Sequence, residues 1–106
     1  MSDKAYLDDN GNIIKCSDLI YWAVTMENNN RRIGLDIIKV DNEEIKVSTV
    51  FLGLNHNFGD GPDLWFETMI FGGINDGWQD RYSTREQALI GHQKAIEIAK
   101  SDKVVE

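Results

Sequence analysis

The side chains best suited to chemistry in this sequence gather in residues 54–62, which read Leu-Asn-His-Asn-Phe-Gly-Asp-Gly-Pro. This segment joins two predicted strands, and it exceeds the roughly two to five residues of an ordinary hairpin loop. Its polar groups can donate and accept hydrogen bonds beside an aromatic ring; the residues are Asn55, His56, Asn57, Phe58 and Asp60. Two interpretations stay open. The segment is a binding loop, or its polar side chains cap the turn while Phe58 enters the core.

Glu67 is a second candidate, because it stands between Trp65 and Met69 on one face of a predicted strand. An acid on an apolar face needs a polar partner or a wet edge. Symmetric strand pairing places Thr49 roughly opposite, where its hydroxyl could donate to the carboxylate. As a general base with His56, Glu67 would make the protein a small hydrolase. The alternative is a half-exposed carboxylate that keeps this face soluble.

A second loop rich in functional residue types covers residues 72–82. It carries Trp78, Arg81 and Tyr82, which are types that dominate the energetics of protein interfaces. Trp78 could equally close one edge of the core. Gly72 and Gly73 are not followed by the Lys and Ser or Thr of a phosphate-binding loop, so the sequence gives no support for mononucleotide hydrolysis.

The remaining histidine, His92, falls on the predicted buried stripe of the last helix. We expect it to be a core residue with satisfied hydrogen bonds, because no metal ligand or triad partner lies within one helical turn. Whether His56 and His92 converge in space stays open. The sequence assigns no catalytic residue, no metal ligand and no cofactor.

The elements that position these residues follow from periodicity and turn signals. Asn10-Gly11 between two short apolar runs predicts a hairpin. A helix is predicted over residues 18–27, with Ser17 as N-cap and Asp18 as a first-turn acid, and its apolar positions are Leu19, Trp22, Ala23 and Met26. Strands are predicted over residues 32–40, with a bulge near Ile38, and over residues 45–53 and 64–71.

The last helix begins after Ser83, which forms a predicted capping box with Glu86, and runs to about residue 100. Its predicted buried stripe is Ala88, Leu89, His92, Ala95, Ile96 and Ala99. The order of elements predicts one α+β domain over residues 1–106, with residues 101–106 as a frayed tail. We expect an antiparallel sheet of the N-terminal hairpin plus three longer strands, with two helices packed on one face.

Charge and composition limit the partners. The chain of 106 residues has 11 Lys and Arg against 18 Asp and Glu, a formal charge of -7. This charge repels phosphate backbones and anionic lipids, so we expect neither direct nucleic-acid binding nor membrane binding. It could attract a partner with a basic surface, or it could serve solubility alone. The sequence begins without an apolar signal region and contains no apolar run of membrane-spanning length, which predicts a cytoplasmic protein.

Several segments together resemble a pattern found in small hypothetical proteins of bacteriophages and prophages. They are residues 47–58, 66–73, 81–84 and 91–92, joined by residues 6–8, 10–11 and 18–23, so the resemblance covers most of the chain. The resemblance implies a setting and no activity: a phage gene product in the bacterial cytoplasm.

Two further functional hypotheses follow. The first is a non-enzymatic binding module that presents the two loops to a host or defence protein. The second is a small-molecule binder, for example of a nucleotide signal, with a base stacked on an aromatic ring and a phosphate paired with Arg81; the candidate rings are Phe58, Trp65 and Trp78. A homodimer is also compatible with the apolar second face of the strand over residues 64–71.

Overall fold

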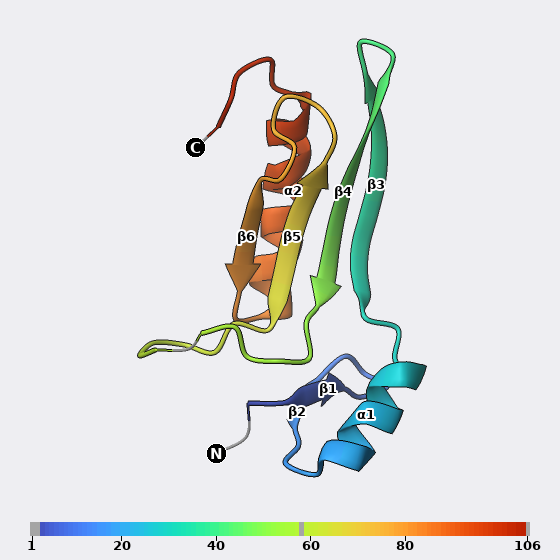
Figure 1. Ribbon diagram of the computed structural model, residues 1–106, viewed down its shortest axis with the longest axis vertical. Helices are drawn as coiled ribbons and strands as arrows, with labels where there is room; N and C mark the ends of the chain where they lie inside the picture. Colours follow the sequence, from blue (N-terminus) through green and yellow to red (C-terminus); the bar gives the residue numbers. More distant parts are fainter. Residues whose placement is uncertain (1–2, 58, 106) are drawn as a thin grey trace.

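The structure, a computed structural model, describes residues 3–57 and 59–105. Within these residues the chain forms β1 (Ala5–Leu7), β2 (Ile13–Lys15), α1 (Leu19–Asn28), β3 (Arg32–Val40), β4 (Glu43–Phe51), β5 (Phe66–Phe71), β6 (Gln79–Tyr82) and α2 (Arg85–Lys100). β1 and β2 make a two-stranded sheet, and the other strands make a four-stranded antiparallel sheet in the order β3-β4-β5-β6 (Figure 1). The predicted α+β class with antiparallel sheets and two helices is confirmed.

The N-terminal hairpin and α1 form a unit beside one end of the four-stranded sheet. The Asp8 carboxylate accepts the backbone N–H groups of Asn10 and Asn12 and so fixes the hairpin turn. Asp18 caps α1 by accepting the N–H of Tyr21 at 3.0 Å. The Trp22 indole donates to the Ala5 carbonyl at 2.8 Å, which attaches α1 to β1.

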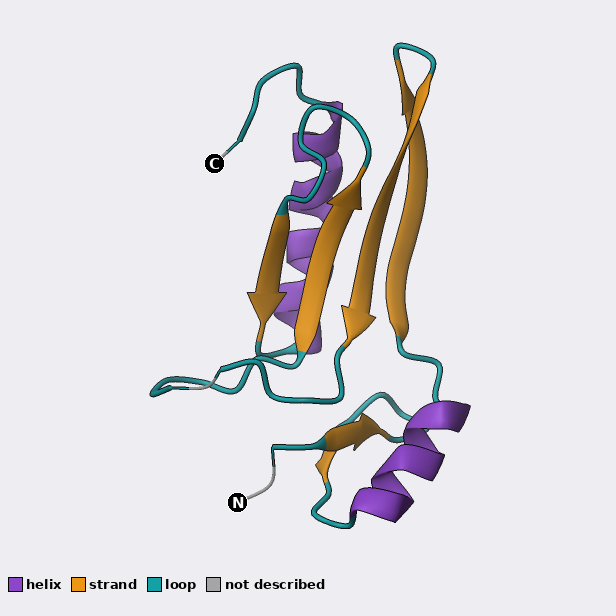
Figure 2. Cartoon of the chain, in the orientation of Figure 1, coloured by secondary structure: helices purple, strands orange, loops and turns teal. Residues whose placement is uncertain are grey.

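This placement differs from the predicted arrangement. The hairpin forms its own sheet, and α1 packs against β1, whereas α2 alone covers a face of the four-stranded sheet (Figure 2). The apolar pattern of a helix shows that one side is buried, but it does not identify the element that buries it.

Alternation along β4 and β5 agrees with the prediction. Ile45, Val47, Thr49 and Phe51 are buried on β4, and Phe66, Thr68 and Ile70 are buried on β5. The register irregularity of β3 lies between Arg32 and Gly34 and not near Ile38. β6 was not predicted, because its Gln-Asp-Arg-Tyr sequence is short and polar and lacks apolar alternation.

α2 begins one residue later than predicted. Thr84 is the N-cap and Gln87 completes the capping box, in place of Ser83 and Glu86. The predicted stripe is also partly wrong, because Leu89 is 46% exposed and Ile96 is only partly buried. The observed buried positions repeat at three or four residues and are mostly small: Ala88, Gly91, His92, Ala95, Ile98 and Ala99.

Two apolar clusters fill the molecule. The first joins the N-terminal unit to the sheet and contains Ala5, Leu7, Met26, Phe51, Trp65, Phe66, Tyr82 and Ala88. The second lies between α2 and the other end of the sheet and contains Ile45, Val47, Ile70, Ala95, Ile98 and Ala99. The strand register puts a polar row, Thr49 paired with Thr68, between the two.

Candidate interaction surface

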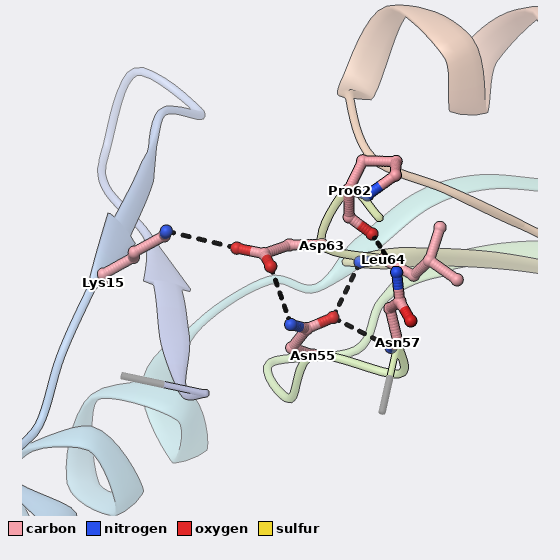
Figure 3. Close-up of polar contacts among 6 residues, drawn as sticks. All are labelled: Lys15, Asn55, Asn57, Pro62, Asp63 and Leu64. Atoms are coloured by element: carbon pink, nitrogen blue, oxygen red, sulfur yellow. Dashed lines mark hydrogen bonds and ion pairs between the residues drawn. The ribbon is translucent and has the colours of Figure 1, made fainter. Parts of the chain in front are cut away.

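The loop over residues 54–62 is held by its own amide side chains (Figure 3). Asn55 Oδ1 accepts the backbone N–H groups of Asn57 and Leu64, each at 2.9 Å. Asn55 Nδ2 donates to Asp63 at 2.8 Å, and the same carboxylate reaches Lys15 of β2 at 3.1 Å. Asn55 therefore closes the loop and, through Asp63, connects it to the hairpin.

The next residues of this loop have similar roles. Asn57 Nδ2 donates to the carbonyls of Asp60 and Pro62, while the Asp60 side chain lies at the exposed tip. His56 Nδ1 lies 2.9 Å from the Leu54 carbonyl, which accepts its hydrogen. Phe58 lies outside the described residues. These contacts favour the interpretation in which the polar side chains brace the loop.

The two loops that the sequence singled out lie at opposite ends of the sheet. Residues 54–62 precede the start of β5 at Phe66, and residues 72–78 follow its end at Phe71 (Figure 1). Glu67 and Arg81 lie on the strands between them. The loops therefore cannot meet in a single site.

The aromatic candidates among the described residues pack against the core. Trp65 is 3% exposed and stacks on Phe51, with ring centroids 6.2 Å apart. Tyr82 is buried, and this burial raises the pKa of its phenol because the phenolate would lose hydration. Trp78 is half-buried and packs against the second cluster. Trp65 and Tyr82 therefore present no free stacking face.

Glu67 and Arg81 are brought together on the face of the sheet opposite α2. Arg81 Nε donates to Glu67 Oε2 at 2.9 Å, and the two residues are register partners on β5 and β6. The predicted pairing of Glu67 with Thr49 is wrong by one position, because Val50 lies opposite Glu67 while Thr49 faces α2. Since His56 is oriented by the loop backbone and Glu67 by Arg81, the contacts do not assemble an acid and base pair.

No described element covers this second face of the sheet. Alternation and register place on it Leu35, Ile37, Lys46, Ser48, Val50, Glu67, Met69, Phe71, Gln79 and Arg81. The Lys46 ammonium lies 4.9 Å from the centroid of the Phe71 ring. The face therefore mixes apolar side chains with charges that are already paired or stacked.

α1 presents a more uniformly apolar surface. Ile20 is 76% exposed, Leu19 is 62% exposed, and Tyr21 and Val24 are both more than half exposed. Ile20 and Val24 lie one turn apart and so share one side of the helix. Only Met26 of this helix is fully buried. We refer to Leu19, Ile20, Tyr21 and Val24 as the α1 apolar face.

This surface was not predicted from the sequence. Leu19 and Ala23 recur at helical spacing with Trp22 and Met26, but both are exposed. A signal was present, since Ile20, Tyr21 and Val24 lie on the other side of the same helical wheel. A ten-residue helix that is apolar on both sides requires either deep burial or a partner.

His92 is a core residue in a buried chain of hydrogen bonds. Its Nδ1 lies 2.6 Å from Thr49 Oγ1, which lies 2.6 Å from Thr68 Oγ1, and its Nε2 lies 2.7 Å from Asp36 Oδ2. The order Asp, His, Thr resembles a nucleophile triad, but Thr49 is fully buried and no substrate can reach it. Gly34 makes room for the ring, because a Cβ there would stand 3.0 to 3.1 Å from it.

A cavity of about 440 Å³ lies between the hairpin, the end of α1 and the start of α2. Arg32 and Arg85 line it, and neither takes part in an ion pair found among the described residues. Asp8 also lines it, and the hydrogen bonds from Asn12 hold the pKa of that carboxyl below its usual value. The cavity therefore offers guanidinium groups, amides and a carboxylate to a polar ligand.

Within residues 3–57 and 59–105, the His, Cys, Asp and Glu side chains form no group of three that could hold a metal ion. Across the same residues, no helix is both long and apolar enough to cross a membrane. No protein-family model, curated protein or solved structure matches this chain. The functional assignment therefore depends on the geometry of the chain itself.

Proposed function

We infer that the protein is a phage-encoded, non-enzymatic binding module that engages a host or defence protein in the bacterial cytoplasm. The observation that carries this proposal is the α1 apolar face, where Leu19, Ile20, Tyr21 and Val24 are each more than half exposed on one short helix. Contiguous exposed apolar surface on a small soluble protein is typical of a protein interaction site. The phage setting comes from the sequence resemblance alone.

The chemistry around α1 supports a partner with an apolar groove and a basic rim. The charged groups at the helix are carboxylates, Asp18 at its N-cap and Glu27 in its last turn, and the helix contains no basic residue. A helix of this kind fits an apolar groove, with Ile20 and Val24 as anchors one turn apart. The rim of that groove should be basic, because it faces carboxylates on a protein of charge -7.

The test uses a matched pair of charge insertions. Ile20→Lys places an ammonium in the α1 apolar face, and Ile90→Lys makes the same change at a 69% exposed position on α2. Both variants should melt near the parent temperature. A partner captured from host lysate by the parent and by Ile90→Lys should be lost with Ile20→Lys. Equal capture by all three proteins would refute the assignment to α1.

A small-molecule ligand remains the second candidate, and the cavity beside Arg32 and Arg85 favours it. The stacking arrangement expected from sequence is not supported, because Trp65 is buried and Arg81 is paired with Glu67. A nucleotide in this cavity would pair its phosphate with the two guanidinium groups. A thermal-shift screen of nucleotides tests the idea, since any stabilisation should disappear in Arg85→Gln. A hydrolase using His56 and Glu67 has the least support.

A further inference from the structure

β3 is an edge strand whose outer side is uncovered. It pairs with β4 on one side, and α2 is the only other described element that it contacts. Nine residues at about 3.3 Å each give an edge about 30 Å long. Such an edge carries a row of backbone donors and acceptors that a further strand can pair with.

The strand is least protected in its middle, because its register shift lies near the start, between Arg32 and Gly34, and Lys39 lies near the end. It contains no proline, and its side chains on the open face include Leu35, 39% exposed, and Ile37, 62% exposed. The one charge directed toward the α2 side, Asp36, already accepts a hydrogen bond from His92. A long apolar edge of this kind attracts another strand.

We propose that a second copy of this chain pairs with β3 in the antiparallel sense, giving a two-fold dimer with a continuous eight-stranded sheet. The charges at the two ends of β3 identify the occupant. Arg31 and Arg32 lie at its start, Asp41 lies in the turn that follows it, and Glu43 and Glu44 begin β4 beside that turn. A two-fold axis through the strand places the basic start of each copy beside the acidic turn of the other.

The side chains also select a register. Pairing centred on Asp36 would set two carboxylates directly opposite each other, and pairing centred on Leu35 would set Arg31 opposite Lys39. Pairing centred on Ile37 avoids both like-charge contacts and sets Leu35 opposite Lys39. It also brings the start of each β3 beside the partner's turn, which carries Asp41. The Ile37 side chains of the two copies then lie directly opposite each other on the open face.

The dimer leaves the α1 apolar face available. β3 follows the C-terminal end of α1, so the partner's hairpin turn approaches that end, whereas Leu19 and Ile20 lie at the other end of the helix (Figure 1). The assembly would carry one α1 at each end of the sheet. Two linked contacts raise the apparent affinity for a repeated or dimeric target without any new contact. The dimer is independent of the proposed function, which concerns α1.

The register can be tested by cysteine crosslinking in a Cys16→Ser background. In an Ile37-centred dimer the two Cα atoms at position 37 are about 4.5 to 5.5 Å apart, within the range for a disulfide. Ile37→Cys should therefore form a covalent dimer on mild oxidation. Leu35→Cys is the control, because its two copies would stand about 13 Å apart, four residues along the strand. A protein that stays monomeric by light scattering into the high micromolar range, or a dimer without the Ile37→Cys crosslink, would overturn the proposal.

Charge reversal supplies an independent test. One variant carries Arg31→Glu and Arg32→Glu; the other carries Asp41→Asn and Glu44→Lys. Asp41 has φ 51°, a backbone conformation that asparagine tolerates. Each variant alone should dimerise at least about tenfold more weakly than the parent, because like charges meet at both ends of the interface. An equimolar mixture should recover a heterodimer. Parent-like affinity for both single variants, or no recovery in the mixture, would contradict the antiparallel pairing.

Discussion

Replacing Thr49 by valine tests the buried polar row directly. The substitution keeps the shape of the side chain and removes a hydroxyl that lies 2.6 Å from both His92 Nδ1 and Thr68 Oγ1. All three side chains are buried, so His92 and Thr68 would each lose a partner that water cannot replace. An unsatisfied buried polar group costs about 1 to 3 kcal/mol, so we expect a loss of about 2 to 4 kcal/mol in the free energy of unfolding.

That loss is large against the roughly 5 to 15 kcal/mol of a typical domain. At about 4 to 8 °C per kcal/mol for a domain of this size, the melting temperature of Thr49→Val should fall by about 10 to 25 °C. Calorimetry or circular dichroism measures the change. Thr49→Ser, which retains the hydroxyl, is the control and should lie much closer to the parent. The combination of Thr49→Val with Thr68→Val and His92→Leu should recover most of the loss, because it removes the unpaired groups. The reasoning fails if Thr49→Val melts at or above the temperature of Thr49→Ser.

Three further predictions concern stability. Gly91→Ala should lower the denaturation midpoint in urea, because the new Cβ would overlap the Tyr82 ring. Inside an exposed helix the same change stabilises by about 0.5 to 1 kcal/mol. Leu89→Asp should remain soluble and melt cooperatively, since Leu89 is 46% exposed, whereas Ala95→Asp should give an unfolded or insoluble protein, since Ala95 is fully buried. The pKa of Asp8 is lowered in the folded state, so its contribution to stability is present above the unfolded pKa and is lost as pH falls through the folded pKa. NMR titration should give a low pKa for this carboxyl, and Asp8→Asn should remove its contribution to acid destabilisation.

Many of the strands and helices could be predicted from local sequence patterns. The Asn-Gly turn identified β1 and β2, and strict alternation identified the buried faces of β4 and β5. The caps were off by one residue because Ser83 and Thr84 are both good N-cap residues, and only the geometry of the chain selects Thr84. β6 was not predicted, because a short polar strand is specified by pairing with its neighbour β5 and not by its own sequence.

The candidate site was harder to predict from the sequence, because the type of a polar side chain does not identify its hydrogen-bond partner. Asn55 and Asn57 are residue types expected in a ligand-binding loop, yet their side chains form hydrogen bonds with the loop backbone. The partner of Glu67 lies on β6, a strand that was expected to be loop. The burial of His92 was anticipated, but its contact with Asp36 spans 56 residues of sequence and follows from tertiary packing alone.

The elongated shape of the molecule gives one physical reason for both proposed interfaces. Its Cα radius of gyration is 15.1 Å, against about 13 Å for a compact domain of this length, and it extends over 47 × 30 × 20 Å. An elongated chain of 106 residues buries less apolar surface per residue than a sphere does. The exposed apolar side chains include those on α1 and along β3, besides others such as Ile74, Leu89 and Ile90. Since binding to the folded state stabilises it by mass action, a second copy at β3 and a groove at α1 would both supply burial that one copy lacks.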